Sequence, residues 1–251
     1  MKDYNYSRLA KYYDIVETNE SVNEFNEVLD KLLKKMNIKE VLDISCGTGL
    51  QSIALAKKGY KVTASDINGS MLKVAKEKAK REKINIEFRQ GDMRNAKQGK
   101  FDAVISIYNS IGHLTKKDFE KAIRNIRENL KDEGVFIFDI FNLDFMKTAF
   151  IAHEFIDKSV EFDDMKFVRF NKNSFDSDKG LMSMNQKTYI QKGMDKPEVT
   201  KESWDMQIYN SDELKNILEK NGFEVVDFLD MSGNKFDKDK SVFILTVARK
   251  R

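Results

Sequence analysis

The alternation of apolar and polar positions divides residues 20–141 into two kinds of segment. Short apolar runs rich in β-branched residues have the length of buried parallel strands, and they alternate with stretches whose apolar residues recur every three to four positions. The predicted strands are 41–44, 60–66, 84–88, 101–107 and 135–141, and the predicted helices are 21–37, 50–58, 70–83 and 118–130. This alternation predicts an α/β fold built on a parallel sheet.

The pattern changes between residues 155 and 208. Apolar and polar residues there alternate with a period of two over 162–174, 181–191 and 199–208, and residues 176–180 have the composition of a hairpin turn. A helix with Asn210 or Ser211 as its cap and the strands 224–229 and 241–248 follow. We therefore predict one α/β domain, residues 1–154 and 209–251, interrupted at 155–208 by an antiparallel β insert that covers it as a lid.

Residues 1–18 are rich in tyrosine and predict a short aromatic helix, with Tyr4, Tyr6, Tyr12 and Tyr13 among its members. Such a helix either packs on the edge of the domain or closes over a ligand as a flap. The next helix begins with Ser21 and Glu24, the spacing of a capping box.

Composition excludes several classes of function. The net charge is only +3, and bases and acids are interspersed, so no basic patch predicts a nucleic-acid partner. A single cysteine excludes an internal disulfide and a cysteine-rich zinc site. No apolar run has the length of a membrane span, and the N-terminus does not resemble a signal peptide, so we expect a cytoplasmic protein without a membrane partner.

Candidate chemistry begins where the first predicted strand ends. Asp43 is followed by Ser45-Cys46-Gly47-Thr48-Gly49 and then by a helical pattern. Glycines let the backbone approach a ligand closely, and a helix N-terminus presents free N–H groups. A nucleotide-like ligand fits this turn, but a dinucleotide fingerprint requires Gly or Ala at position 52, where Ser52 stands.

Acids also end the next two strands. Asp66 lies where nucleotide-binding α/β folds place a carboxylate that accepts both hydroxyls of a ribose. Asp92 and Met93 follow the third strand. Taken alone, Asp66 could be a simple strand cap and Gly91-Asp92 a plain turn.

As a set, these features resemble the class I S-adenosylmethionine (SAM) dependent methyltransferases, with Ser45 at the first glycine of their acid-x-Gly-x-Gly-x-Gly motif. The resemblance implies a Rossmann-like seven-stranded sheet in the order 3-2-1-4-5-7-6, with the last strand antiparallel. It also implies SAM as the cofactor. The cofactor-binding residues that it implies are Asp43, Ser45, Cys46, Gly47, Gly49, Asp66, Ile67, Asp92, Met93, Ile107 and Asn109.

The segment after the fourth strand bears on the substrate. Asn109-Ser110, His113 and Leu114 are similar to the Asn-Ser-x-x-His-Leu of glycine N-methyltransferases and nucleotide-sugar N,N-dimethyltransferases, whereas the Pro-Pro pair of DNA amine methyltransferases is absent. The resemblance implies methylation of a small amine. His113 then orients or deprotonates the amine with help from Tyr13, or it only hydrogen-bonds its own loop.

Three further residues are candidate substrate contacts. Asn142 loosely matches an asparagine that helps glycine N-methyltransferases bind a carboxylate, and Arg169 and Tyr189 are the candidates of the insert. An acceptor of the glycine or sarcosine type would need Arg169 and Asn142 for its carboxylate, whereas a nucleotide-linked amino sugar would need a wider cleft.

Other functions stay open at this point. The chain could methylate tRNA or protein, or it could be a SAM-binding domain without catalysis. Cys46 stands on the cofactor turn and is not expected to act as a covalent nucleophile, and no cluster of metal ligands is evident. We expect a small-molecule substrate and a monomer or homodimer.

Overall fold

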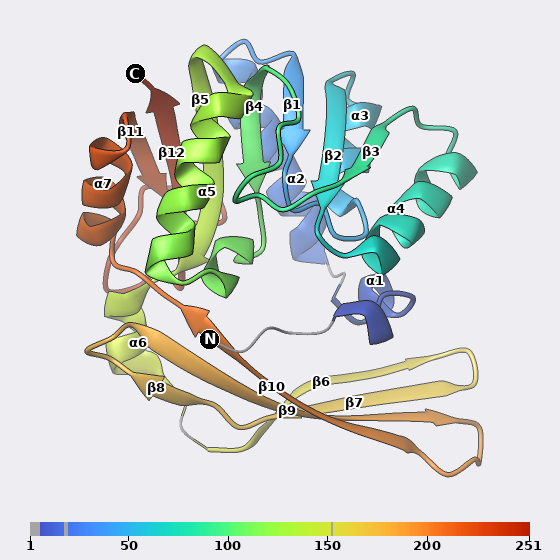
Figure 1. Cartoon of the computed structure of the whole chain (residues 1–251). Helices are drawn as coiled ribbons and strands as arrows, with labels where there is room; N and C mark the ends of the chain where they lie inside the picture. The colour runs from blue at the N-terminus through green and yellow to red at the C-terminus, as the bar shows by residue number, and fades with distance from the viewer. Residues whose placement is uncertain (1–5, 18–19, 152) are drawn as a thin grey trace.

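A seven-stranded sheet forms the centre of the molecule in the computed structural model, which describes residues 6–17, 20–151 and 153–251 (Figure 1). Tyr4 of the predicted aromatic helix lies outside the described residues. The strands are β1 (Glu40–Asp43), β2 (Lys61–Asp66), β3 (Glu87–Gln90), β4 (Phe101–Ser106), β5 (Leu130–Phe141), β11 (Phe223–Leu229) and β12 (Phe243–Lys250). Their order is β11-β12-β5-β4-β1-β2-β3, and β12 pairs antiparallel with both β5 and β11. The predicted order, with the last strand inserted antiparallel, is confirmed.

Helices cover both faces of this sheet. They are α2 (Glu20–Lys35), α3 (Leu50–Lys57), α4 (Gly69–Arg81), α5 (Lys116–Asn129) and α7 (Ser211–Lys220). On one face Leu29 of α2 and Leu55 of α3 share a buried cluster with Ile105 of β4. On the other face Phe119 of α5 and Leu214 of α7 pack in a second cluster. The spacing of apolar residues thus buries one stripe of each helix against the sheet.

A second, five-stranded antiparallel sheet forms the insert. Its strands are β6 (Phe155–Phe162), β7 (Met165–Asn171), β8 (Ser174–Asp176), β9 (Leu181–Lys192) and β10 (Glu198–Gln207). They pair in the order β10-β9-β7-β6, with β8 on β9. Figure 1 shows this insert sheet facing the carboxyl ends of the parallel strands.

Several predicted boundaries are wrong. The expected strand 162–174 is the end of β6, a turn in which Asp163 has φ 50°, the whole of β7, and the start of β8. Strand β3 begins at Glu87 because the N–H of Ile84 still bonds to Ala79, and this bond closes the end of α4. Helix α2 begins at Glu20, so Ser21 lies inside the helix and is not its cap.

Four short helical segments occur besides these in the described part of the chain, and the sequence predicted only some of them. Helix α6 (Leu143–Ala149) was not predicted. The N-terminal region contains a 3₁₀ turn, η1 (Tyr6–Arg8), and α1 (Tyr13–Glu17), rather than one continuous helix. A further 3₁₀ turn, η2 (Ser110–His113), follows β4. Of the two expected caps of α7, Asn210 is the one that caps the helix, and it forms a capping box with Glu213.

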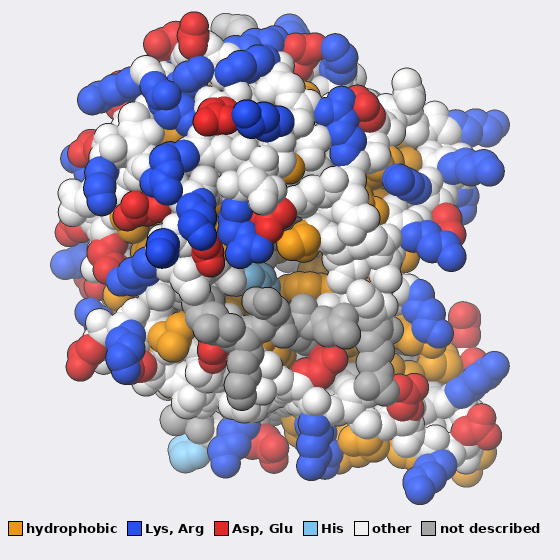
Figure 2. Space-filling model, in the orientation of Figure 1, with side chains coloured by type: hydrophobic (Ala, Val, Ile, Leu, Met, Phe, Trp, Pro, Cys, Tyr) orange, Lys and Arg blue, Asp and Glu red, His pale blue; other side chains and the backbone are white. Residues whose placement is uncertain are grey.

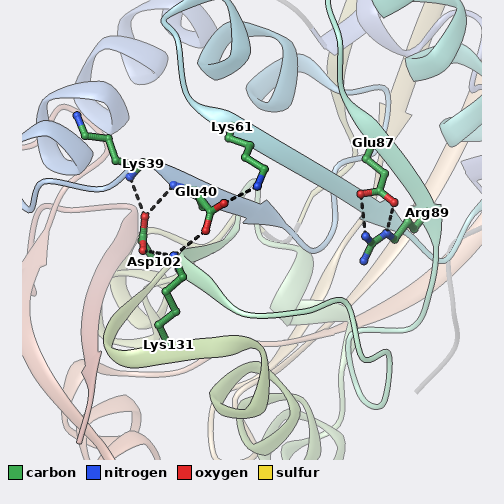
Figure 3. Close-up of polar contacts among 7 residues, drawn as sticks. All are labelled: Lys39, Glu40, Lys61, Glu87, Arg89, Asp102 and Lys131. Atoms are coloured by element: carbon green, nitrogen blue, oxygen red, sulfur yellow. Dashed lines mark hydrogen bonds and ion pairs between the residues drawn. The ribbon is translucent and has the colours of Figure 1, made fainter.

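The amino ends of the parallel strands are joined by charged side chains (Figure 3). Asp102 of β4 accepts hydrogen bonds from the backbone N–H groups of Lys39 and Glu40, at 3.0 and 2.8 Å. Lys131 of β5 lies 2.8 Å from Asp102 and 2.6 Å from Glu40, and Lys61 of β2 pairs with Glu40. This network joins the amino ends of the strands, on the side of the sheet that lies away from the insert.

The surface agrees with the mixed charge of the sequence. Figure 2 shows Lys, Arg, Asp and Glu side chains interspersed, and hydrophobic side chains between the main sheet and the insert sheet. In the part of the chain that the structure describes, we find no helix with the length and apolarity needed to span a bilayer.

Candidate functional site

The glycine turn after β1 has the conformation that its sequence predicts. Gly47 and Gly49 have φ angles of 52° and 79°, where side chains with a Cβ are strained. A Cβ on Gly49 would also lie 3.2 Å from the Cβ of Ala75 in α4. The N–H of Gly47 donates to Oδ2 of Asp66 at 2.8 Å, so the turn is joined to the end of β2.

Asp66 and Asp92 lie at neighbouring strand ends but differ in their partners. Burial raises the pKa of Asp66, although backbone N–H donors, including those of Asn68 and Gly47, oppose the shift. Asp92 forms an ion pair with Arg94, which lowers the pKa of its carboxyl group. The Asp92 carboxylate, one of the cofactor contacts that the resemblance implies, is thus already paired with Arg94.

A cavity of about 470 Å³ lies over these strand ends, and we call it the strand-end cavity. It brings together most of the predicted cofactor residues and both predicted catalytic residues. They are Ser45, Cys46, Gly47, Asp66, Ile67, Asp92, Met93, Ile107, Tyr13 and His113.

Three predicted cofactor residues do not line this cavity. Asp43 is buried and accepts a hydrogen bond from Oγ of Ser52 at 2.6 Å, and its burial raises its pKa to about 7. Gly49 shapes the turn through its backbone, which has a φ of 79°. Asn109 has φ 58° and accepts from the N–H of Phe141, so it holds the loop that carries η2 onto β5.

Residues 6–17, which we call the N-terminal flap, close one side of the strand-end cavity. Asp14 of the flap accepts from Oγ1 of Thr48 and pairs with Lys78 of α4. On the other side, Leu9 and Val16 pack with Phe167 of the insert sheet. Figure 1 shows α1 between the two sheets, which supports the flap alternative over simple packing on the domain edge.

The flap brings Tyr6 to His113, a contact that was not predicted. The Tyr6 hydroxyl lies 2.9 Å from Nε2 of His113, and the Tyr6 ring packs edge-on against Tyr13. Burial raises the pKa of Tyr13 well above its ordinary value, so its phenol is even less prone to ionise than a free tyrosine and can donate a hydrogen bond. The tyrosine-rich N-terminus is the sequence signal that could have identified Tyr6, although from the sequence a role beside His113 is predicted only for Tyr13.

A second cavity of about 300 Å³, the lid cavity, lies between the flap and the insert sheet. It shares Tyr6, Tyr13, Leu50 and Tyr108 with the strand-end cavity. The two cavities therefore meet beside the flap tyrosines.

The structure changes the picture for each predicted substrate contact. Arg169 lines the lid cavity, but its guanidinium is bound by the carboxylates of Glu17 and Asp157, so it is not available to anchor a substrate carboxylate. Burial opposes the charge, yet these two carboxylates raise the pKa of Arg169 further above its ordinary value.

Tyr189 and Asn142 lie outside the residues that line either cavity. The Tyr189 ring packs edge-on against Phe170, with the Lys187 ammonium 4.7 Å from its centroid. Asn142 is buried, donates to the carbonyls of Lys238 and Ser241, and caps α6. Its side chain is used to join the strand end to the loop before β12.

The residues of the strand-end cavity fit a nucleoside with an attached amino acid. The half-buried carboxylate of Asp66 suits ribose hydroxyls, and the apolar side chains of Ile67 and Met93 suit the faces of an adenine. The small residues Ser45 and Gly47 leave room beside the turn. Burial raises the pKa of the Cys46 thiol, so it stays protonated rather than forming a nucleophilic thiolate.

No group of three or more metal-ligating side chains occurs among the described residues.

Comparison with known proteins identifies a methyltransferase domain model that matches residues 41–134. The chain is 30% identical over 233 residues to an uncharacterized protein of Methanocaldococcus jannaschii, covering 90% of this chain and 77% of that protein. It is 32% identical over 147 residues to the glycine N-methyltransferase of Homo sapiens, covering 52% of this chain and 50% of that protein. Against two further curated relatives the chain spans about half of their length, 57% and 55%.

Solved structures share the whole architecture at low identity. A SAM-dependent methyltransferase of Clostridium acetobutylicum superposes with a TM-score of 0.82 at 21% identity and covers 98% of both chains. An amino pentose methyltransferase of Micromonospora echinaspora, solved with SAM bound, superposes with a TM-score of 0.76 at 16% identity and covers 100% of this chain and 99% of that one. The insert sheet is therefore included in the shared fold.

Proposed function

Because the chain belongs to the class I SAM-dependent methyltransferases, we propose that it transfers a methyl group from SAM to the amine of a small molecule. The observation that carries this proposal is the junction of the strand-end cavity and the lid cavity at Tyr6, Tyr13 and Tyr108. A cofactor held in the first cavity and an acceptor in the second would meet at that junction.

In this proposal Gly47, Asp66, Ile67 and Met93 hold the cofactor, with Asp92 shared between its Arg94 partner and the adenine. SAM supplies a methyl group on a sulfonium, which is reactive enough that the protein mainly has to align the reactants. Such alignment can lower a barrier by about 7–11 kcal/mol. Tyr6 and Tyr13 exclude water from the junction by lying across it.

An amine must lose its proton before it can act as a nucleophile, and His113 is the proposed group for that proton. An imidazole can accept a proton near neutral pH. The Tyr6 hydroxyl, 2.9 Å from Nε2, fixes the orientation of the ring. Tyr13, held as a neutral phenol, orients the acceptor and does not act as a base.

The enclosure of the lid cavity favours a small acceptor over tRNA or protein. The cavity is covered by the flap on one side and by the insert sheet on the other, and its volume of about 300 Å³ suits a single small molecule. Sequence similarity to a glycine N-methyltransferase and structural similarity to an amino pentose methyltransferase support an amine as the accepting group.

The proposal is tested by cofactor binding followed by turnover. Calorimetry should show binding of SAM and of S-adenosylhomocysteine but not of NAD, since Ser52 replaces the third small residue of a dinucleotide turn. Addition of pooled small amines to the SAM complex should then produce S-adenosylhomocysteine, and pooled alcohols should not. Binding of NAD in preference to SAM, or turnover with tRNA alone, would contradict the proposal.

A further inference from the structure

We propose that the lid cavity selects an amine that carries hydroxyl or amide hydrogen-bond donors and no carboxylate, and that Asn171 is the residue that recognises those donors. The proposal rests on the proposed function, because it treats the lid cavity as the acceptor site. It favours one of the two acceptor types that the sequence leaves open.

The wall of the lid cavity follows the alternation of side chains along the insert strands. Phe167, Arg169 and Asn171 of β7 are spaced by two and all line the cavity. Asn171 is the direct cross-strand partner of Gln186 in β9, which also lines it. Two amides therefore stand side by side on the face of the insert sheet that closes over the site.

Asn171 has an unused hydrogen-bond acceptor in this wall. The residue is 6% exposed, and its Oδ1 atom has no hydrogen-bond partner. Nearly all buried polar side-chain atoms in proteins find a partner, so one that does not calls for a reason. An N–H or O–H donor on a ligand in the cavity would satisfy this oxygen.

The charges of the cavity disfavour an acidic acceptor. Among the described residues that line it, the charged ones are Glu17, Asp157 and Arg169. Both acids bind the one base, whose side chain is only 12% exposed. A substrate carboxylate would meet two acids and a guanidinium that is already paired.

The arrangement of these charges is built into the strands. The register of β6 against β7 shifts between Ile156 and Lys158, and the irregularity places Asp157 beside Arg169. Bulges of this kind commonly re-aim one side chain near a functional site. The pairing of Arg169 with Asp157 is thus a property of the insert sheet, whereas its second partner, Glu17, comes from the N-terminal flap.

The remaining lining is largely aromatic and suits the apolar face of an uncharged body. Its members include Tyr12, Tyr13, Tyr108, Phe141, Trp204 and Phe243. Flat aromatic rings bury the CH groups of a ligand and leave its polar groups to form hydrogen bonds with other residues. The amides of Asn171 and Gln186 supply that hydrogen bonding.

The test uses ligand pairs that differ only in the carboxylate. Glycine is compared with glycinamide, and phenylalanine with phenylalaninamide, by titration into the full chain saturated with S-adenosylhomocysteine. We expect each amide to bind about tenfold tighter than its acid, because the acid must desolvate a charge without a free cation. Equal or tighter binding of the acids, or no binding of either amide, would overturn the proposal.

Matched variants test the role of Asn171. Asn171→Leu should weaken binding of the amides about tenfold, since one hydrogen bond is lost. Asn173→Leu is the control, because Oδ1 of Asn173 is also buried without a partner but the residue does not line the lid cavity. Equal loss in both variants, with thermal melts showing both folded, would reject recognition by Asn171.

A second variant is independent of Asn171. Asp157→Asn removes one of the two carboxylates on Arg169 and should shift the preference toward the acids by about threefold or more. An unchanged preference would count against the charge argument. Failure of S-adenosylhomocysteine to bind the wild-type chain would instead reject the proposed function itself, and this inference with it.

Discussion

At the scale of single residues, one carboxyl group in the core has an unusually high pKa. Asp139 at the end of β5 is fully buried, and its Oδ2 accepts the N–H of Asn109 at 3.0 Å while Oδ1 has no partner. Burial raises its pKa to about 7. The same carboxyl group supports the left-handed turn at Tyr108 and Asn109, where the two cavities meet.

The raised pKa of Asp139 predicts a pH dependence of stability. The ordinary pKa is 3.8, so between about pH 4 and pH 7 the folded state holds a proton that the unfolded state has lost. Stability from this group is therefore complete below pH 4 and is lost as pH rises toward 7. Relative to Asp139→Asn, the free energy of unfolding of the wild type should fall by roughly 1 kcal/mol or more over that range.

Urea denaturation of both proteins at several pH values measures this difference. The amide in Asp139→Asn keeps an oxygen for the N–H of Asn109 and cannot ionise, so the comparison isolates the proton. A difference that stays constant from pH 4 to pH 8 would contradict the assignment.

The contact between Tyr6 and His113 carries a second prediction at this scale. His113→Ala should lower kcat by about 10²–10⁴-fold, the usual range for a general base, and leave the affinity for S-adenosylhomocysteine within a few fold. Tyr6→Phe removes the hydroxyl and should lower kcat less. In the double variant the losses should not multiply, because both act through one hydrogen bond. Full activity of His113→Ala would leave only a structural role for this residue.

Local sequence could predict which strand-end residues gather at the strand-end cavity. Gly47, Asp66 and Asp92 follow strands that can be recognised from their own neighbours, and parallel strands bring their carboxyl ends to one edge. The partners of Arg169 could not be predicted from local sequence, because one of them, Glu17, is distant in the chain and approaches only in the folded molecule. The same holds for Asn142, because the carbonyls of Lys238 and Ser241 that it bonds are equally remote.

At the scale of elements, the N-terminal flap connects the main domain to the insert sheet. Asp14 joins it to Thr48 and Lys78 of the main domain, and Glu17 joins it to Arg169 of the insert sheet. The sequence predicted the aromatic character of this segment but not its partners, which have no local signature. The hairpin at Asp163 was also missed, because the turn lacks glycine and the alternation of residues continues across it.

The contacts of the N-terminal flap with the main domain predict a kinetic effect. Asp14→Ala should speed release of S-adenosylhomocysteine several fold, since the flap loses its contacts with Thr48 and Lys78, and should hardly change the melting temperature. Glu82→Ala is the matched control, because it breaks the Lys57–Glu82 ion pair on the main domain, which involves neither cavity. Stopped-flow displacement measures both rates. Equal rates for Asp14→Ala and the wild type would mean that the flap does not restrain the cofactor.

At the scale of the whole molecule, the fold separates stability from function. The network of Asp102, Lys131 and Glu40 joins the amino ends of the parallel strands, whereas both cavities lie at their carboxyl ends (Figure 3). Asp102→Ala removes the acceptor of two backbone N–H groups and should cost about 1–3 kcal/mol of stability. Affinity for S-adenosylhomocysteine, measured by calorimetry well below the melting temperature, should be unchanged. A large loss of affinity would show that the amino ends of the parallel strands are energetically coupled to the cavities at their carboxyl ends.

The measurement that tests the central claim most directly is transfer of a deuterium-labelled methyl group from SAM, followed by mass spectrometry. The acceptors are glycine, sarcosine, glycinamide, a nucleotide-linked amino sugar and bulk tRNA, offered separately to the full chain. We predict label on the nitrogen of a small amine and none on tRNA. Label on tRNA alone, or no label on any small amine while SAM is bound, would contradict the assignment of the lid cavity as a site for a small amine.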